Sequence, residues 1–457
     1  MVAGACGGKS HEVRVTEVVP ESDAGVSAVG GSAPVGGVGG AAREAGGVTG
    51  SGGAAGVANS SGGMSVGAGG DSSQCDPSSL ASGSLELITV APGCVAADGD
   101  SEAPRLTWDG RYVTFQSDAD DLVPNDLNGH FDAYLFDREQ RTIDRLNVTP
   151  TGDSSIGYGF RPVASDDGRW VAFSAYTYDL TEPEPREGVL IYLRDRSTQT
   201  TRLLPGSYVC AETPQISSDG SLIVWETYTS CTGEITAEHY YGVLEYDQNS
   251  DVLSSVGETH GSDNYGPAIS RDGRWLVRGI RPPDSRGAYA SELVIRDRST
   301  GEDQIAAVGL AFNYASITVS DDGNVVAYAN NGQIYRYDHA ASEPRLVSAN
   351  AQGDPANDVA WDVALSGDGR RLVFTSVASD LVENDTNGVR DLFLYDADTR
   401  ELSRLSLAPD GAEADDESAD PAISGDGRFV AFASKARNLL PASTSGNWQI
   451  FVLDLGE

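Results

Sequence analysis

An Asp-Gly pair that recurs seven times constrains the fold of this chain more than any other feature. Each pair follows a short segment such as PAIS at 421–424 and precedes an alternating segment such as RFVAFAS at 428–434. Because glycine accepts a positive φ without a Cβ clash, Asp-Gly between two such segments predicts a β-hairpin. Successive pairs lie 46 to 58 residues apart. They begin at Asp109, Asp167, Asp219, Asp272, Asp322, Asp368 and Asp426.

Two further strands follow each hairpin. The third strand of a repeat ends on aspartate, as in DAYLFD at 132–137, and a fourth, such as TIDRLNV, comes after a short turn. Four antiparallel strands per repeat, repeated in a ring, predict the blades of a β-propeller. Because the terminal aspartates recur once per blade, we interpret them as features of the fold and not as catalytic groups. They are Asp137, Asp195, Asp247, Asp297, Asp338, Asp396 and Asp454.

The two ends of the repeat region predict how the ring closes. The chain stops after its seventh third strand, so one fourth strand is missing there. The segment LELITVAPG at 85–93 has the pattern of the fourth strand LSRLSLAPDG at 402–411. Residues 85–90 are therefore predicted to complete the last blade, which leaves no exposed edge at the junction. The expected fold is all-β, a seven-bladed β-propeller over 84–457 closed by an N-terminal strand.

The repeats resemble a known family. SGDGRFVAFAS at 424–434 and SGDGRRLVFTS at 366–376 are similar to TolB-like, or WD40-like, β-propeller repeats, and the likeness covers nearly all of 85–457. The resemblance implies a propeller of the cell envelope, or a secreted one, that binds other proteins. Some members of the family form the non-catalytic half of peptidases, but nothing in this sequence matches a peptidase half.

Residues 1–80 have a different composition from the rest. They hold 21 of the 54 glycines, and the first aromatic residue of the chain is Trp108. Such a segment cannot bury enough apolar surface to offset its chain entropy, so we expect a disordered Gly/Ala/Ser-rich tether. Ala-Gly-Ala before Cys6 resembles the cleavage box of bacterial lipoproteins. This predicts lipidation of Cys6 and a leader upstream of Met1; a plain disordered cytosolic tail is the alternative.

The charge of the chain restricts its partners. There are 68 acidic against 31 basic side chains, a net charge of −37. Nucleic acid and unaided binding to an anionic membrane are excluded, because both need basic surfaces. No run of 18 apolar residues is present, which excludes a transmembrane helix. Acidic loops of blades six, seven and one should share one face, where cations or a basic protein are the natural partners. General solubility is the alternative explanation of this charge.

Two loops carry a candidate metal site. Blades one and six contain PNDLNGHFDAYLFD at 124–137 and ENDTNGVRDLFLYD at 383–396. Oxygen ligands at alternate positions, with a glycine for the tight turn, are how short loops surround calcium, although a distal bidentate glutamate is missing. The alternative is a hairpin whose side chains bind loop amides. The candidate ligands are Asp126, Asn128, Asp132, Asp385, Asn387 and Asp391.

The cysteines predict an oxidising compartment. If Cys6 carries lipid, four remain, and loops on the same face favour the pairs Cys210–Cys231 and Cys75–Cys94. Four free thiols are the alternative. Together with the resemblance, this predicts a periplasmic or outer-membrane lipoprotein, or an extracellular protein.

The sequence predicts function less sharply than fold. The first prediction is a monomeric, non-catalytic binding module that engages a protein partner through its acidic face. One alternative is a calcium-stabilised structural protein of the cell surface. The other is an enzyme, a lyase or a glycan-active protein, with its site at the mouth of the channel.

Overall fold

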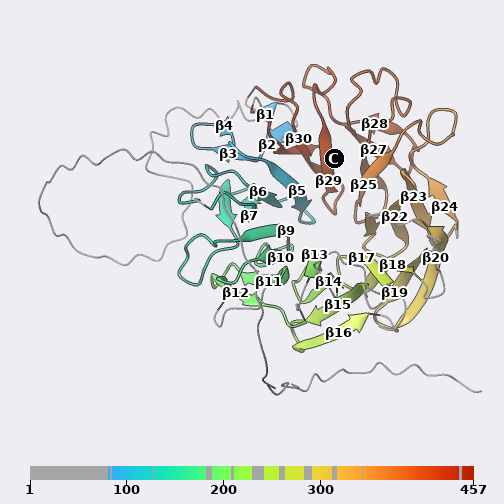
Figure 1. Ribbon diagram of the computed structural model, residues 1–457. Coiled ribbons are helices and arrows are strands. Elements are labelled where there is room, and N and C mark those ends of the chain that lie inside the picture. The colour runs from blue at the N-terminus through green and yellow to red at the C-terminus, as the bar shows by residue number, and fades with distance from the viewer. Residues whose placement is uncertain are drawn as a thin grey trace, which may run out of the picture. The chain divides into compact units, whose positions relative to one another are not determined.

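The computed structural model confirms the seven-bladed β-propeller that the repeats predict (Figure 1). The structure describes residues 81–456 except 83–84, 127, 182–187, 207–209, 229–240, 257–262, 282–290, 311–315, 342 and 442–444. The tether prediction for residues 1–80 and Cys6 lies outside these residues. In the described part of the chain, no helix is long and apolar enough to cross a membrane.

Blades one to four are four-stranded antiparallel meanders, in which sequence neighbours pair. Blade one contains β5 (Ser101–Leu106), β6 (Tyr112–Ser117), β7 (Asp132–Asp137) and β8 (Thr142–Arg145). Blade two contains β9 (Tyr158–Ala164), β10 (Trp170–Tyr176), β11 (Leu190–Asp195) and β12 (Thr200–Leu203). Blade three contains β13 (Cys210–Ile216), β14 (Leu222–Tyr228), β15 (Tyr241–Asp247) and β16 (Val252–Val256). Blade four contains β17 (Asp263–Ile269), β18 (Trp275–Arg281), β19 (Ser291–Asp297) and β20 (Glu302–Leu310).

Blades five and six repeat this order, and blade seven is completed from the other end of the chain. Blade five contains β21 (Ile317–Val319), β22 (Val325–Asn330), β23 (Gln333–Asp338) and β24 (Pro344–Leu346). Blade six contains β25 (Ala360–Leu365), β26 (Arg371–Ser376), β27 (Asp391–Asp396) and β28 (Leu402–Arg404). Blade seven contains β29 (Ser418–Ile423), β30 (Phe429–Ser434), β31 (Gln449–Asp454) and then β2 (Leu85–Leu87) and β1 (Ala81–Ser82). A separate small hairpin joins β3 (Val90–Ala91) to β4 (Val95–Ala96).

The predicted ring closure is confirmed in register. Leu85, Glu86 and Leu87 pair with Leu453, Val452 and Phe451. The strand ends at Leu87 instead of residue 90, because Val90 and Ala91 turn away into the small hairpin. Closure therefore joins strands more than 350 residues apart in sequence, and the third strand of blade seven is covered on its outer side.

Buried aromatic pairs fill equivalent places in five blades. Each joins the second strand of a blade to its third, with ring centroids 5.5 to 5.8 Å apart. Alternation along a strand sends every second side chain to one face of the blade, so these rings pack between neighbouring sheets. The pairs are Phe115–Tyr134, Phe173–Tyr192, Tyr328–Tyr335, Phe374–Phe393 and Phe432–Phe451.

The aspartates that end the third strands are structural, as the repeat predicts. In blades one, two, four and seven the arginine after the Asp-Gly pair binds this aspartate, as Arg111 Nη2 binds Asp137 Oδ2 at 2.8 Å. The same carboxylate also accepts the backbone N–H of the residue two positions later, Glu139 in blade one. Each aspartate therefore ties the hairpin turn to the following turn of its own blade.

Candidate functional site

The first strands of the seven blades enclose a central channel. Each contacts the first strand of the next blade, from β5 round to β29 and back to β5. In six blades the register with the second strand slips by one residue, and a residue at the slip has a positive φ of 44° to 51°. Such bulges redirect side chains. The residues are Ala103, Arg161, Thr213, Gly266, Asp362 and Asp420.

A tryptophan crosses one end of this channel. Trp108 precedes the Asp-Gly pair of blade one, and its Nε1 donates to Asp321 Oδ2 in blade five at 3.2 Å. Blades one and five are as far apart as a ring of seven allows. Arg271 of blade four lies over the indole, 4.5 Å from its centroid, and binds Asp166 at 2.7 Å. We call Trp108, Asp166, Arg271 and Asp321 the channel floor. Burial raises the pKa of Asp321, whereas the hydrogen bond from Trp108 and the charge of Arg271 lower it.

Two arginines in the channel have no carboxylate partner within ion-pair distance among the described residues. They are Arg105 of blade one, whose Nη1 donates to its neighbour's carbonyl, Pro104 O, at 2.9 Å, and Arg161 of blade two. Within the described ranges both arginines therefore lack a carboxylate partner, in a chain in which acidic side chains outnumber basic ones by more than two to one. The surrounding protein lowers the pKa of Arg105 through desolvation, although the side chain is exposed to solvent; Asp420 and Asp362 oppose this shift, whereas Arg161 adds to it.

Two aspartates from the preceding blades face the same space. Asp420 of blade seven accepts the backbone N–H of Ala103 at 3.1 Å, and Asp362 of blade six lies 4.0 Å from Arg390. Burial, together with the charge of Asp420, raises the pKa of Asp362. Four charged residues therefore occupy the first strands of consecutive blades, two aspartates on blades six and seven and two arginines on blades one and two.

The opposite end of the ring carries the loops between second and third strands, and we call it the loop face. An aromatic cluster lies there at blades one and two. The His130 ring stacks on Tyr158 with centroids 4.2 Å apart, and Tyr158 stacks on Phe160 at 5.6 Å. Tyr176 pairs with Tyr158 across the sheet. We call this group the loop-face cluster: His130, Ile156, Tyr158, Phe160, Tyr176 and Tyr178.

The predicted calcium ligands of blade one do lie together, but a guanidinium lies among them. Arg145 Nη1 is 3.0 Å from Asp126 Oδ1 and 3.5 Å from Asp132 Oδ2. Asn128 donates to Asp132 at 3.1 Å, and Tyr134 donates to the other oxygen of Asp126. Burial, together with the charge of Asp126, raises the pKa of Asp132 to about 7. We call Asp126, Asp132 and Arg145 the arginine clasp of blade one.

Blade six has the same arrangement. Arg404 Nη1 lies 3.1 Å from Asp385 Oδ1, 3.5 Å from Asp391 Oδ2 and 2.7 Å from Glu413 Oε1. Asn387 donates to Asp391 at 2.9 Å. Hydrogen bonds from the hydroxyl and backbone N–H of Thr386 lower the pKa of Glu413 to about 2. Within the described ranges, no group of three or more His, Cys, Asp or Glu is placed to hold a metal ion.

Blades five and seven show what the arginine does. There the third strand begins with an amide, Gln333 or Gln449, which accepts a hydrogen bond from a hydroxyl two residues beyond the fourth strand, Ser348 at 2.7 Å or Thr89 at 2.6 Å. At the register position of Arg145 and Arg404 these blades have leucine, Leu346 and Leu87. Arginine therefore occurs where the buried third-strand residue is charged, and leucine where it is neutral. This correlation fits a structural counter-ion.

Calcium binding stays a prediction. Because a guanidinium already lies between the carboxylates, a calcium ion would have to displace it, and the two cations should compete. We expect Arg145→Gln together with Arg404→Gln to raise calcium affinity by at least about tenfold over the unmodified protein. Isothermal titration with CaCl₂ measures this, and melting with and without chelator checks it. Equal or weaker binding by the double variant would contradict the competition.

The disulfide prediction is only partly within the described residues. Cys94 is disulfide-bonded. Cys6, Cys75 and Cys231 lie outside the described residues, as does the side chain of Cys210, so the pairs Cys75–Cys94 and Cys210–Cys231 stay predictions.

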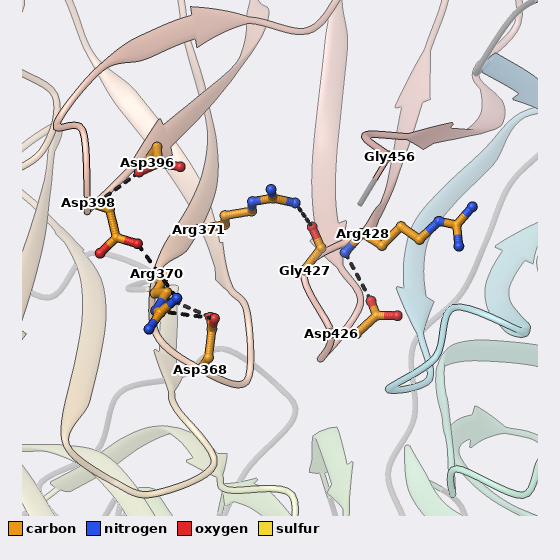
Figure 2. Close-up of a pocket in the computed structure, with 9 residues that line it drawn as sticks. All are labelled: Asp368, Arg370, Arg371, Asp396, Asp398, Asp426, Gly427, Arg428 and Gly456. Carbon is orange, nitrogen blue, oxygen red and sulfur yellow. Dashed lines mark hydrogen bonds and ion pairs between the residues drawn. The ribbon is translucent and has the colours of Figure 1, made fainter.

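A cavity of about 400 Å³, separate from the channel, lies between blades six and seven at the end of the ring that carries the Asp-Gly turns (Figure 2). In blades one, two and four an arginine after the third-strand aspartate fills this position: for example, Arg138 binds Gly110 O and Glu86, and Arg298 binds Gly273 O and Glu245. Blade seven has Leu455 there instead. Figure 2 shows the remaining arginines engaged within the protein, Arg371 with Gly427 O at 2.8 Å and Arg370 near Asp368 at 3.7 Å.

Comparison with known proteins supports the fold alone. No protein-family model matches the chain, and no curated protein matches it in sequence. An oligogalacturonate lyase in complex with manganese is 15% identical with a TM-score of 0.51, covering 82% of this chain and 97% of that one. A prolyl endopeptidase structure is 11% identical with a TM-score of 0.51, covering 81% of this chain. This chain spans about half of that protein's length, 51%. TolB from Acinetobacter baumannii is 14% identical, covering 76% of this chain and 81% of that one, with a TM-score of 0.39.

The prediction that the protein is not an enzyme requires correction. An oligogalacturonate lyase is among the solved structures with the same fold, at 15% identity and a TM-score of 0.51. A propeller without a second domain can therefore be an enzyme, and the absence of a peptidase half does not exclude catalysis. The reasoning failed because fold does not determine activity, which depends on the side chains of the site.

Sequence reasoning missed the channel residues. Arg105, Arg161, Asp362 and Asp420 occupy the bulge region of four first strands, where most other repeats have an uncharged residue at the same position. Because these residues depart from the repeat, the sequence could have marked them as candidate functional residues. The sequence could not show that they lie close together, because that depends on which blades become neighbours around the ring.

Proposed function

We propose that the protein is a binding module of the cell envelope that engages a protein partner over its loop face. The loop-face cluster carries the proposal. Ile156 is 60% exposed, Tyr178 48% and Tyr176 39%, although large apolar and aromatic side chains are normally covered. Aromatic residues are enriched at the centres of protein interfaces, where a polar rim surrounds them.

The surroundings of the cluster supply that rim. The backbone N–H of Ile156 binds Asp179 at 2.9 Å, and the adjacent loops of blade one hold Asp98, Asp118, Asp120 and Asp121. Burial, then repulsion from Asp98, raises the pKa of Asp121, as expected where like charges crowd. A partner with an apolar centre and basic edges would complement this surface. The Cys94 disulfide supports an oxidising compartment such as the periplasm.

The proposal is tested by capture from envelope extract with matched variants. Ile156→Ser/Tyr178→Ser removes two exposed apolar side chains from the loop face. The control, Val252→Ser/Ile305→Ser, removes two from outer strands, where these residues are 40% and 54% exposed. We expect one protein to be captured by the unmodified chain and the control, and at least about tenfold less by the loop-face variant. Added salt should reduce capture. Equal capture by all three chains would refute the proposal.

A further inference from the structure

We propose that the central channel binds the free carboxyl terminus of a short peptide, whose carboxylate lies between Arg105 and Arg161. This inference concerns a different site from the loop-face cluster and does not depend on the partner proposed above. It rests on the two arginines, on a small pocket beside one of them, and on the aspartates of the adjoining blades seven and six.

The two guanidinium groups come from neighbouring first strands and repel each other. Neither has a carboxylate within 4.0 Å among the described residues. The nearest acid, Asp420, already accepts the N–H of Ala103 at 3.1 Å. A planar guanidinium binds a carboxylate through two parallel hydrogen bonds, so one carboxylate between the two arginines would satisfy both and remove their repulsion.

A pocket beside Arg105 gives the site its side-chain preference. Its volume is about 130 Å³, and Leu106, Val163 and Ile216 form its apolar wall. A cavity of about 150 Å³ is large enough for benzene, so this one has room for a branched aliphatic side chain. Because Arg105 lines the same pocket, a carboxylate held by that arginine would place the side chain of the terminal residue at its opening. This geometry favours an apolar terminal residue.

The two aspartates of the channel could bind the amino end of the same peptide. Asp362 and Asp420 lie on blades six and seven, which precede blade one around the ring. A peptide amino group carries the opposite charge to these carboxylates, so a short peptide with both ends free could bind the arginines through its carboxylate and the aspartates through its amino group. The channel floor, Trp108 hydrogen-bonded to Asp321, spans the turn-side end. The ligand should therefore approach from the loop face.

Isothermal titration with Ala-Ala-Leu tests the inference. We expect binding of Ala-Ala-Leu, a loss of at least about tenfold when its carboxyl end is amidated, and a smaller loss when its amino end is acetylated. Ala-Ala-Asp should bind more weakly than Ala-Ala-Leu, because the pocket wall is apolar. Absence of binding by Ala-Ala-Leu, or equal binding of its amide, would overturn the proposal. Binding of glucuronate in preference to the peptide would also overturn it, since that ligand has a carboxylate and no amino group.

Variants of the chain locate the site. Arg105→Gln should weaken Ala-Ala-Leu binding at least about tenfold, and Arg105→Lys should weaken it less, because lysine keeps the charge but loses the bidentate geometry. Arg345→Gln is the control, an exposed arginine on an outer strand of blade five. Equal binding by all three variants would overturn the placement. Because the peptide series uses the unmodified protein, misfolding of a variant cannot decide the outcome. The Ile156→Ser/Tyr178→Ser variant should bind Ala-Ala-Leu normally, which separates this site from the proposed partner surface.

Discussion

Replacing Arg145 by leucine is expected to destabilise the propeller by about 3–5 kcal/mol, because two buried carboxylates lose their counter-ion. The side chains of Asp126 and Asp132 are 2% and 0% exposed, and Asp126 Oδ1 accepts no hydrogen bond from the described residues. Its charge is therefore balanced by Arg145 alone. Urea denaturation followed by circular dichroism measures the loss.

The charge-free blades supply the matched rescue. Asp126→Asn/Asp132→Asn/Arg145→Leu resembles blades five and seven, where an amide and leucine stand at the corresponding positions. We expect this triple variant to recover at least half of the stability that Arg145→Leu loses. The control Arg345→Leu changes an exposed side chain and should stay within about 0.5 kcal/mol of the unmodified protein. A triple variant no more stable than Arg145→Leu would show that the arginine acts through packing and not through charge.

The loss should also depend on pH. A carboxyl group whose folded-state pKa is raised above its unfolded value lowers stability as pH rises from the unfolded toward the folded pKa. Burial holds the pKa of Asp132 at about 7 even beside the arginine, and removing Arg145 should raise it further. We therefore expect the difference between Arg145→Leu and the unmodified protein to be larger at pH 8 than at pH 5. An equal difference at both values would count against a charge effect.

Gly425→Ala is expected to cost about 1–3 kcal/mol, although alanine usually stabilises a compatible backbone. A Cβ at Gly425 would lie 1.9 Å from Trp108 Cδ1, so the indole could no longer cross the channel above it. In a Trp108→Ala background the obstacle is gone. There the same substitution should be neutral or stabilise by up to about 1 kcal/mol. Denaturation midpoints of the four proteins give the coupling energy directly.

The control for this cycle is Gly242→Ala. Its Cβ would meet Thr227 Cγ2 at 3.4 Å, an ordinary contact, so Trp108→Ala should not change its effect. If Gly425→Ala costs the same with and without the tryptophan, the indole does not occupy the place that the structure gives it.

The sequence predicted the blades because their determinants are local. Asp-Gly specifies the hairpin turn, and alternation over six or seven residues specifies which face of a strand is buried. Closure by residues 85–87 was also predictable, since a missing fourth strand at one end matched an extra one at the other. Both candidate calcium loops were recognised as equivalent. The arginine among their ligands was not, because Arg145 lies 13 residues beyond Asp132 and on another strand.

The sequence by itself determined the number of blades, the order of their strands and the way the ring closes, because each depends on short repeated patterns. Tertiary structure decided what the ring encloses. Trp108 meets Asp321 across 213 residues, and Arg105 lies across the channel from Asp362 only because blades one and six are brought within two places of each other. Gly367 and Gly425 look like parts of turns in the sequence, yet in the structure they leave room for the side chains of Asp321 and Trp108. Such contacts join side chains of different blades around the closed ring, and no pattern within a single repeat encodes them.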